Sequence, residues 1–375
     1  MTSQQVKMAV REWNLSSQFC EFSRSQARDG GAISSKLFII LPSLACCLAN
    51  AALAASVVKY RVFHVNPRII LVDLAVSNAL YGALRAATLS SNLWNTVTLS
   101  GEEASCGEYL IRDVSCCWLT CSLAFTALAT IYGFVAVALE RVYASLHYKT
   151  YEAKRSVKFS ASAVVVKWLL SLATTVSQMG KIRADVVLSE CSLLNAAITS
   201  GGGMVVMGAN IALESLLLAT FLLVVRVNAR IRRRVRVGAR QADLTTNYQL
   251  EDNIRMGRLL SRLLVMHYGG VVVPQASLIL HQQPWVRALL GDPLLSAALH
   301  DASSVTMPLY GVGFALLCAR HSQTISEKAA KLLPKSFVKV CFPLGWKKKP
   351  IVKAESTGDP MKTMTAIWEL KRQRK

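Results

Sequence analysis

The sequence predicts an all-α membrane protein, a bundle of seven transmembrane helices. Of its 375 residues, 53% are hydrophobic and 17% are charged, whereas a soluble domain usually carries about 25% charged residues. The mean hydropathy is +0.36. Apolar stretches long enough to cross a hydrocarbon core of about 30 Å as helices follow one another along the chain. Their approximate limits are 37–58, 69–90, 116–139, 159–179, 203–225, 263–281 and 294–318.

The third span is the clearest of these, because 116–139 contains no charged residue. As a helix it would be roughly 36 Å long, which is enough to cross the membrane. Glu140 and Arg141 follow it directly, and Tyr143 comes two residues later. An adjacent acid and arginine at the end of an apolar helix either anchor the helix at the interface or form part of a switch.

Charged and polar side chains interrupt other spans, and each needs a partner inside the bundle. Asn50, in the first span, is expected to hydrogen-bond to neighbouring helices. Arg85 lies in the outer third of the second span, and Asp301 lies at a depth within about 3 Å of it in the seventh. Lys167, near the middle of the fourth span, either snorkels or faces the bundle.

A further group of polar residues lies in the middle or outer half of spans five, six and seven. Intramembrane ionisable residues usually face the bundle interior and are functional, so these residues are candidates for a ligand pocket; the alternative is structural pairing. The group consists of Asn210, Glu214, Gln275 and His300. Pro274 and Pro308 lie within spans six and seven, where each is expected to remove a helical hydrogen bond and kink the helix.

The distribution of positive charge predicts the orientation. The segments after spans one, three and five, together with a C-terminal tail at 319–375, hold 32 of the 43 Lys and Arg residues. Because cytoplasmic segments retain positive charge, the N-terminal tail at 1–36 is expected outside and the C-terminal tail inside. Asn14 in the sequence Asn-Leu-Ser is then a glycosylation candidate. The start of the C-terminal tail has the apolar spacing of a short amphipathic helix.

Two motifs indicate a family. The segment that begins at Glu140-Arg141 continues through Ala-Ser to Tyr151-Glu152, and Tyr248-Gln249, followed by Glu251, precedes the sixth span. This pattern resembles the nematode serpentine chemoreceptors of the Sra, Srab, Srb and Sre group, which are seven-transmembrane G protein-coupled receptors. The resemblance covers roughly residues 38–320.

The resemblance implies roles for several residues. Glu140 is expected to hold Arg141 in the resting state, and Arg141 then faces the G protein when the sixth helix swings outward. Cys116 at the outer mouth and Cys191 in the next outer loop occupy the place of the receptor disulfide, with Cys117 and Cys106 as rivals to Cys116. Cys20 and Cys106 are also expected outside, so the sequence leaves open a second bridge between them. Spans two and seven become neighbours, which predicts the Arg85–Asp301 ion pair.

The sequence therefore predicts a multi-pass plasma-membrane chemosensory receptor, expressed in sensory neurons and without a reaction of its own. Its expected partners are a small environmental ligand in the outer half of the bundle, membrane lipid and an inner heterotrimeric G protein. The alternative is a seven-span transporter or ligand-gated channel, although no internal repeat supports a transporter. No cofactor or metal is expected, because the cysteines are not in metal-ligand pairs. Nucleic-acid binding is not expected, because the +21 net charge follows from membrane topology.

Overall fold

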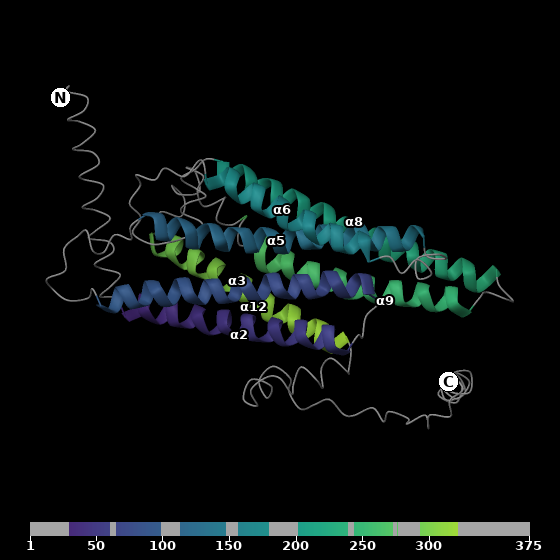
Figure 1. The fold of residues 1–375 in the computed structure, drawn as a ribbon, viewed down its shortest axis with the longest axis horizontal. Coiled ribbons are helices and arrows are strands. Elements are labelled where there is room, and N and C mark those ends of the chain that lie inside the picture. Colours follow the sequence, from purple (N-terminus) through teal and green to yellow (C-terminus); the bar gives the residue numbers. More distant parts are fainter. Residues whose placement is uncertain are drawn as a thin grey trace, which may run out of the picture. The chain divides into compact units, whose positions relative to one another are not determined.

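The structure, a computed structural model, is described for residues 30–60, 65–98, 113–147, 157–179, 202–238, 244–272, 276 and 293–321. In these ranges the chain is helical and contains no strand. The helices (Figure 1) are α2 (Gly30–Tyr60), α3 (Val65–Thr98), α5 (Asp113–Leu146), α6 (Lys158–Met179), α8 (Gly202–Gly238), α9 (Leu244–His267), the π-helix η1 (Tyr268–Val272) and α12 (Pro293–His321).

Helices of membrane length account for five of the seven predicted apolar spans. Among the described residues, five are long and apolar enough to cross a bilayer, namely Ile33–Tyr60, Val65–Trp94, Cys121–Leu146, Lys158–Ser177 and Val205–Arg233. They fall on predicted spans one to five. Part of the predicted sixth span is occupied by the end of α9 and by η1, and the seventh coincides with α12.

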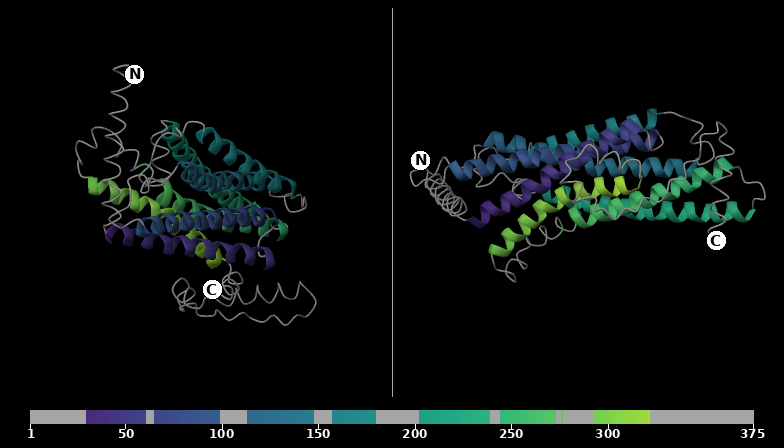
Figure 2. Two further views of the ribbon diagram at one scale, coloured as in Figure 1. Left: turned by 60° about the vertical axis from the view of Figure 1, so that its left-hand side comes forward. Right: turned by 90° about the horizontal axis from the view of Figure 1, so that it is seen from below.

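The helices form a closed ring with one helix outside it. Around the ring, α12 packs on α2, α2 on α3, α3 on α5, α5 on α8, α8 on α9, and α9 on α12 again. Helix α6 lies outside the ring against α3 and α5, as the two further views show (Figure 2). Helix α5 therefore contacts α3, α6, α8 and α9, which places its side chains at the centre of the bundle.

A glycine sets the closest approach between two of these helices. A Cβ on Gly82 of α3 would lie 2.6 Å from the backbone oxygen of Ser43 and 2.8 Å from the backbone nitrogen of Cys47, both on α2. Backbone atoms cannot move aside as a side-chain end can, so only glycine fits at this position. Small residues at helix interfaces are the usual means of close packing in membranes.

The segment between the predicted fifth and sixth spans, 226–262, is largely helical. Helix α8 continues to Gly238 and α9 begins at Leu244. No proline or glycine interrupts 209–237, and the arginines at the end of α8 are good helix formers. As a result, α8 and α9 extend beyond the other helices at one end of the bundle (Figure 1).

Candidate functional site

The acid and arginine that end the third span are buried at the end of α5. Glu140 is 1% exposed and Arg141 is 2% exposed. The Nε and Nη2 groups of Arg141 donate to the two carboxylate oxygens of Glu140, which makes the pair bidentate. The remaining Nη1 donates to the Oδ1 of Asn253 on α9, at 3.3 Å. One guanidinium thus links α5 to α9.

A second connection begins at the same arginine and reaches α8. The hydroxyl of Ser145 donates to the backbone oxygen of Arg141 at 2.7 Å. The side-chain amide of Asn228, on α8, donates to that hydroxyl at 2.9 Å. All three residues are buried, so these bonds lie away from water and fix α8 against α5 close to the Glu140–Arg141 pair.

Helix α9 is also attached to its other neighbours at this end. Glu251 forms an ion pair with Arg232 of α8, and Arg255 donates to the backbone oxygen of His321, the last residue of α12, at 2.8 Å. Burial, together with the nearby charges of Arg255 and Arg262, lowers the pKa of the His321 imidazole to about 4. His321 is therefore neutral at physiological pH, and Arg255 supplies the positive charge that suits a helix C-terminus.

Deeper in the bundle, Glu214 of α8 meets His267 of α9. The carboxylate oxygen Oε2 lies 2.8 Å from the ring nitrogen Nδ1, and the side chains are 1% and 0% exposed. The imidazole packs against Phe134 of α5, with ring centroids 5.1 Å apart, and edge-on against Tyr310 of α12 at 4.6 Å. Side chains from four helices therefore converge on His267.

The backbone changes character directly after His267. Tyr268–Val272 form the π-helix η1, and the hydroxyl of Tyr268 lies 3.2 Å from that of Ser215 on α8. Single π-helical turns within α-helices are rare and frequently mark functional sites. The change of helix type thus falls at the level where α8 and α9 are joined by the Glu214–His267 pair.

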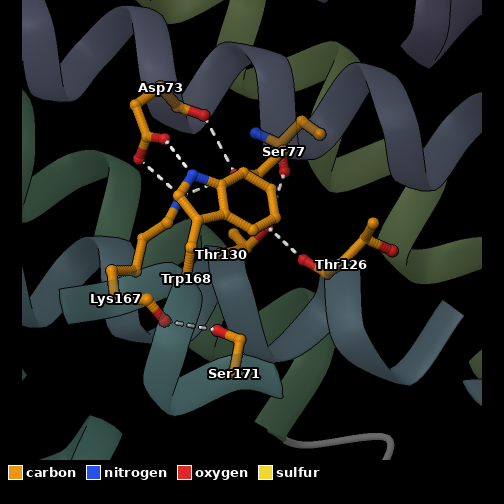
Figure 3. Close-up of polar contacts among 8 residues, drawn as sticks. Asp73, Ser77, Thr126, Thr130, Lys167, Trp168 and Ser171 are labelled. Atoms are coloured by element: carbon orange, nitrogen blue, oxygen red, sulfur yellow. Dashed lines mark hydrogen bonds and ion pairs between the residues drawn. The ribbon is translucent and has the colours of Figure 1, made fainter. Parts of the chain in front are cut away.

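A third polar cluster joins α3 to α6 (Figure 3). The ammonium of Lys167 pairs with Oδ2 of Asp73 and donates to the hydroxyl of Ser77 at 2.9 Å. The indole Nε1 of Trp168 donates to Oδ1 of Asp73 at 2.8 Å. Lys167 therefore faces the bundle rather than snorkelling. The cluster attaches α6 to α3.

Asn50 forms the inter-helix hydrogen bond that the sequence predicted. Its side-chain amide donates to the backbone oxygen of Gly311 on α12 at 2.8 Å and to that of Cys46 at 2.9 Å. On the adjacent α3, Asn78 accepts a hydrogen bond from Thr130 of α5 at 3.3 Å. These bonds tie α2 to α12 and α3 to α5 through the interior of the bundle.

The other predicted positions are distributed as follows. Asn210 is buried on α8, one turn from Glu214, and Pro308 is buried within α12. Tyr143 is 37% exposed, and its ring stacks on Phe159 of α6. Arg85 is buried on α3, but the side chain of its predicted partner, Asp301, lies outside the described residues. The same holds for Asn14, Cys20, Cys106, Cys116, Cys117, Tyr151, Glu152, Cys191, Tyr248, Gln249, Pro274, Gln275, His300 and the helix expected after 321.

Sequence reasoning did not identify Asp73, Asn228, Asn253 or His267 as site residues. The signals for two of them were present. Asp73 is an acid inside the second apolar span, and Lys167 is a base inside the fourth, so the two charges needed each other. His267 is an ionisable residue seven positions before Pro274 in the sixth span. Asn228 and Asn253 carry no charge and lie outside the predicted spans.

Five apolar helices of membrane length among the described residues, with a buried acid–arginine pair near the end of α5, fit a membrane receptor of the G protein-coupled class. The chain belongs to one family within it: residues 31–338 match the model described as "Serpentine type 7TM GPCR receptor class ab chemoreceptor". The chain is therefore a seven-transmembrane, multi-pass receptor of the plasma membrane, as its motifs predicted.

Individual relatives agree with the family. The chain is 26% identical to "Serpentine receptor class alpha/beta-14" of Caenorhabditis elegans over 322 residues, which cover 84% of this chain and 74% of that receptor. It is also 26% identical to "5-hydroxytryptamine receptor 1B" of Homo sapiens over 157 residues. That second match covers 41% of this chain and 37% of the human protein.

Proposed function

We propose that the chain is a chemosensory receptor that binds a small molecule in the outer half of its bundle and activates a heterotrimeric G protein at its inner end. The observation that carries this proposal is the position of Arg141. Its guanidinium is buried, paired with Glu140, and hydrogen-bonded to α9 through Asn253. An arginine held in this way is available to a protein partner only after α9 has moved.

The described structure fits a resting state. Helix α9 is attached to α5 through Asn253, to α8 through Glu251, and to α12 through Arg255. If α9 moves away from α5, Arg141 loses the hydrogen bond to Asn253, and a G protein segment can take the vacated place. Ligand and G protein would then bias the same two-state element, which is the physical content of coupling between two sites.

The ligand side of this mechanism involves Glu214 and Asn210. Both are buried on α8, and Glu214 holds α9 through His267. The second carboxylate oxygen, Oε1, is buried without a hydrogen-bond partner among the described residues, and buried oxygens normally have one. A ligand that donates a hydrogen bond to this oxygen would change how α8 holds α9. Gln275 and His300 remain candidates for the same pocket.

The proposal includes further features. The N-terminus is outside, Asn14 is glycosylated, Cys116 is bonded to Cys191, and Arg85 pairs with Asp301. The cells that express the receptor are sensory neurons. An epitope tag at Met1 tests the orientation: staining of intact cells supports it, whereas staining only after permeabilisation reverses it and favours a channel of opposite topology.

The functional test is a chemical screen on cells that express the full chain together with a promiscuous G protein. We expect a ligand-dependent second-messenger signal that disappears when the G protein is omitted. Cells with Arg141→Ala should lose this signal. Arg232→Ala is the matched control, because Arg232 is also an arginine at this end but its ion pair is partly exposed and such pairs contribute only about 0–1 kcal/mol. A ligand-evoked current without G protein would support the channel alternative and refute the receptor mechanism.

A further inference from the structure

The outward face of α8 changes from apolar to basic at one level. Leu216 is 65% exposed and Leu223 is 61% exposed, and Arg230 follows seven residues later, also exposed. Because seven residues are almost two full turns, these side chains lie on nearly the same side of the helix. Arg226 and Arg233 continue the neighbouring row, and both are exposed. The arginines thus directly follow exposed apolar side chains of a membrane-length helix.

The adjacent helix α9 shows the same change on its exposed face. Val265 is exposed, and Arg258, seven residues before it, is exposed too. Arg262 likewise lies seven residues before Gly269, and both residues are exposed. Helices α8 and α9 pack against each other, and both extend past the rest of the bundle at this end (Figure 2). Two neighbouring helices therefore pass from apolar to basic at the same end.

These arginines are not neutralised within the described part of the chain. Among the side chains of α8 and α9 that the structure describes, Glu251 is the only exposed acid, and it pairs with Arg232. No described residue forms an ion pair with Arg226, Arg230, Arg233, Arg258 or Arg262. The positive charge of this face is therefore available to an external anion.

We propose that Arg226, Arg230, Arg233, Arg258 and Arg262 form a binding surface for the anionic headgroups of phospholipids in the leaflet at this end of the bundle. The surface continues a lipid-exposed apolar face, so lipid reaches it before any soluble protein does. From Arg226 to Arg233 the helix rises about 10 Å, close to the depth of the polar headgroup region, roughly 5–8 Å on each side of the bilayer. Guanidinium groups also match phosphate oxygens with two parallel hydrogen bonds.

The position of the surface gives the lipid a regulatory role. Arg258 and Arg262 lie on α9, the helix whose movement would release Arg141, and Arg226, Arg230 and Arg233 lie on α8, to which α9 is attached. In the proposed orientation this leaflet is the cytoplasmic one, which carries most of the negative lipid. Bound anionic headgroups would therefore bias the positions of α8 and α9, independently of any ligand that binds from the opposite end of the bundle.

The test uses the purified full chain in detergent and native mass spectrometry with added dioleoyl phosphatidylserine or dioleoyl phosphatidylcholine. Wild-type protein should retain phosphatidylserine in preference to phosphatidylcholine. The variant Arg226→Gln/Arg230→Gln/Arg233→Gln should reduce that preference at least about five-fold, the factor that one basic residue near an anionic surface supplies. Should this triple variant fail to fold, the pair Arg258→Gln/Arg262→Gln tests the same surface from α9.

The matched control is Lys59→Gln/Arg68→Gln/Lys158→Gln, which removes three charges at the same end of the bundle but from three other helices. Its preference should stay within about two-fold of the wild-type value, which is a much smaller change than the loss of three headgroup-binding arginines would cause. Equal retention of the two lipids by wild type, or an equal loss in the control, would overturn the proposal, as would displacement of phosphatidylserine by millimolar inorganic phosphate. No ligand or G protein takes part, so the result is independent of the proposed function.

Discussion

Glu214 of α8 and His267 of α9 meet in the interior of the bundle, with carboxylate Oε2 and imidazole Nδ1 2.8 Å apart and both side chains buried. They join the two helices that extend furthest at the end of the bundle where Arg141 lies, at the level where α9 becomes the π-helix η1. The pair therefore connects the candidate ligand region, at Asn210, to the helix that holds Arg141. Loss of this pair should therefore affect the end of the bundle at which Arg141 lies.

We predict that Glu214→Leu or His267→Leu raises ligand-independent signalling and lowers the thermal stability of the purified receptor. Removing one member of a buried pair typically costs about 3–5 kcal/mol, because the other is left without a partner. The double variant should be less destabilised than the sum of the single ones. Leu216→Ala, on the lipid-facing side two residues away, is the control. Additive single effects would show that the pair does not couple α8 to α9.

Asn253→Leu should also raise basal signalling, because it removes the bond that holds α9 to Arg141. A hydrogen bond to a charged group contributes about 1.5–3 kcal/mol, which corresponds to a shift of roughly 10- to 150-fold in the two-state equilibrium. Glu251→Gln on the same helix is the control: its ion pair is partly exposed and such pairs contribute about 0–1 kcal/mol. Second-messenger levels at matched surface expression measure the difference. Equal effects of the two variants would contradict the assignment of Asn253.

Arg141→Ala should abolish ligand-dependent signalling while the receptor still reaches the cell surface. Glu140→Ala should act in the opposite direction and raise basal signalling, since Arg141 then keeps only part of its resting contacts. Surface labelling and nucleotide exchange on the G protein, measured on the same membranes, separate folding from coupling. Normal exchange by well-expressed Arg141→Ala would rule out a coupling role for this residue.

The Asp73–Lys167 pair should matter for stability rather than for signalling. Asp73→Leu leaves a buried ammonium without its carboxylate, and we expect a loss of about 3–5 kcal/mol. Adding Lys167→Met should restore most of that stability, because the unpaired charge is then gone. Thermal unfolding in detergent measures this rescue. If Lys167→Met in the Asp73→Leu background leaves stability as low as before, the cost does not come from the unpaired charge.

Local patterns were enough to predict several elements correctly. The uncharged 116–139 stretch lies within α5, and the motifs at Glu140-Arg141 and Tyr248-Gln249 pointed to the family whose model residues 31–338 match. These features are visible because hydrophobic length and short motifs are properties of consecutive residues. How far each helix continues beyond its apolar span could not be predicted in this way. The thickness of the bilayer limits the length of the apolar run, but a helix can continue past that run into water. Helix α8 accordingly continues 13 residues past Val225.

The sequence by itself determined that this chain crosses the membrane repeatedly, which receptor family it belongs to, and that several polar side chains inside the spans need partners. Only the tertiary structure decided which residues those partners are. Lys167 selects Asp73, Arg141 reaches Asn253, and Glu214 meets His267. The physical reason is that a partner across helices depends on how each helix is rotated and how closely it approaches its neighbour. Those quantities follow from packing contacts between residues far apart in the chain, such as Gly82 against the backbone of α2.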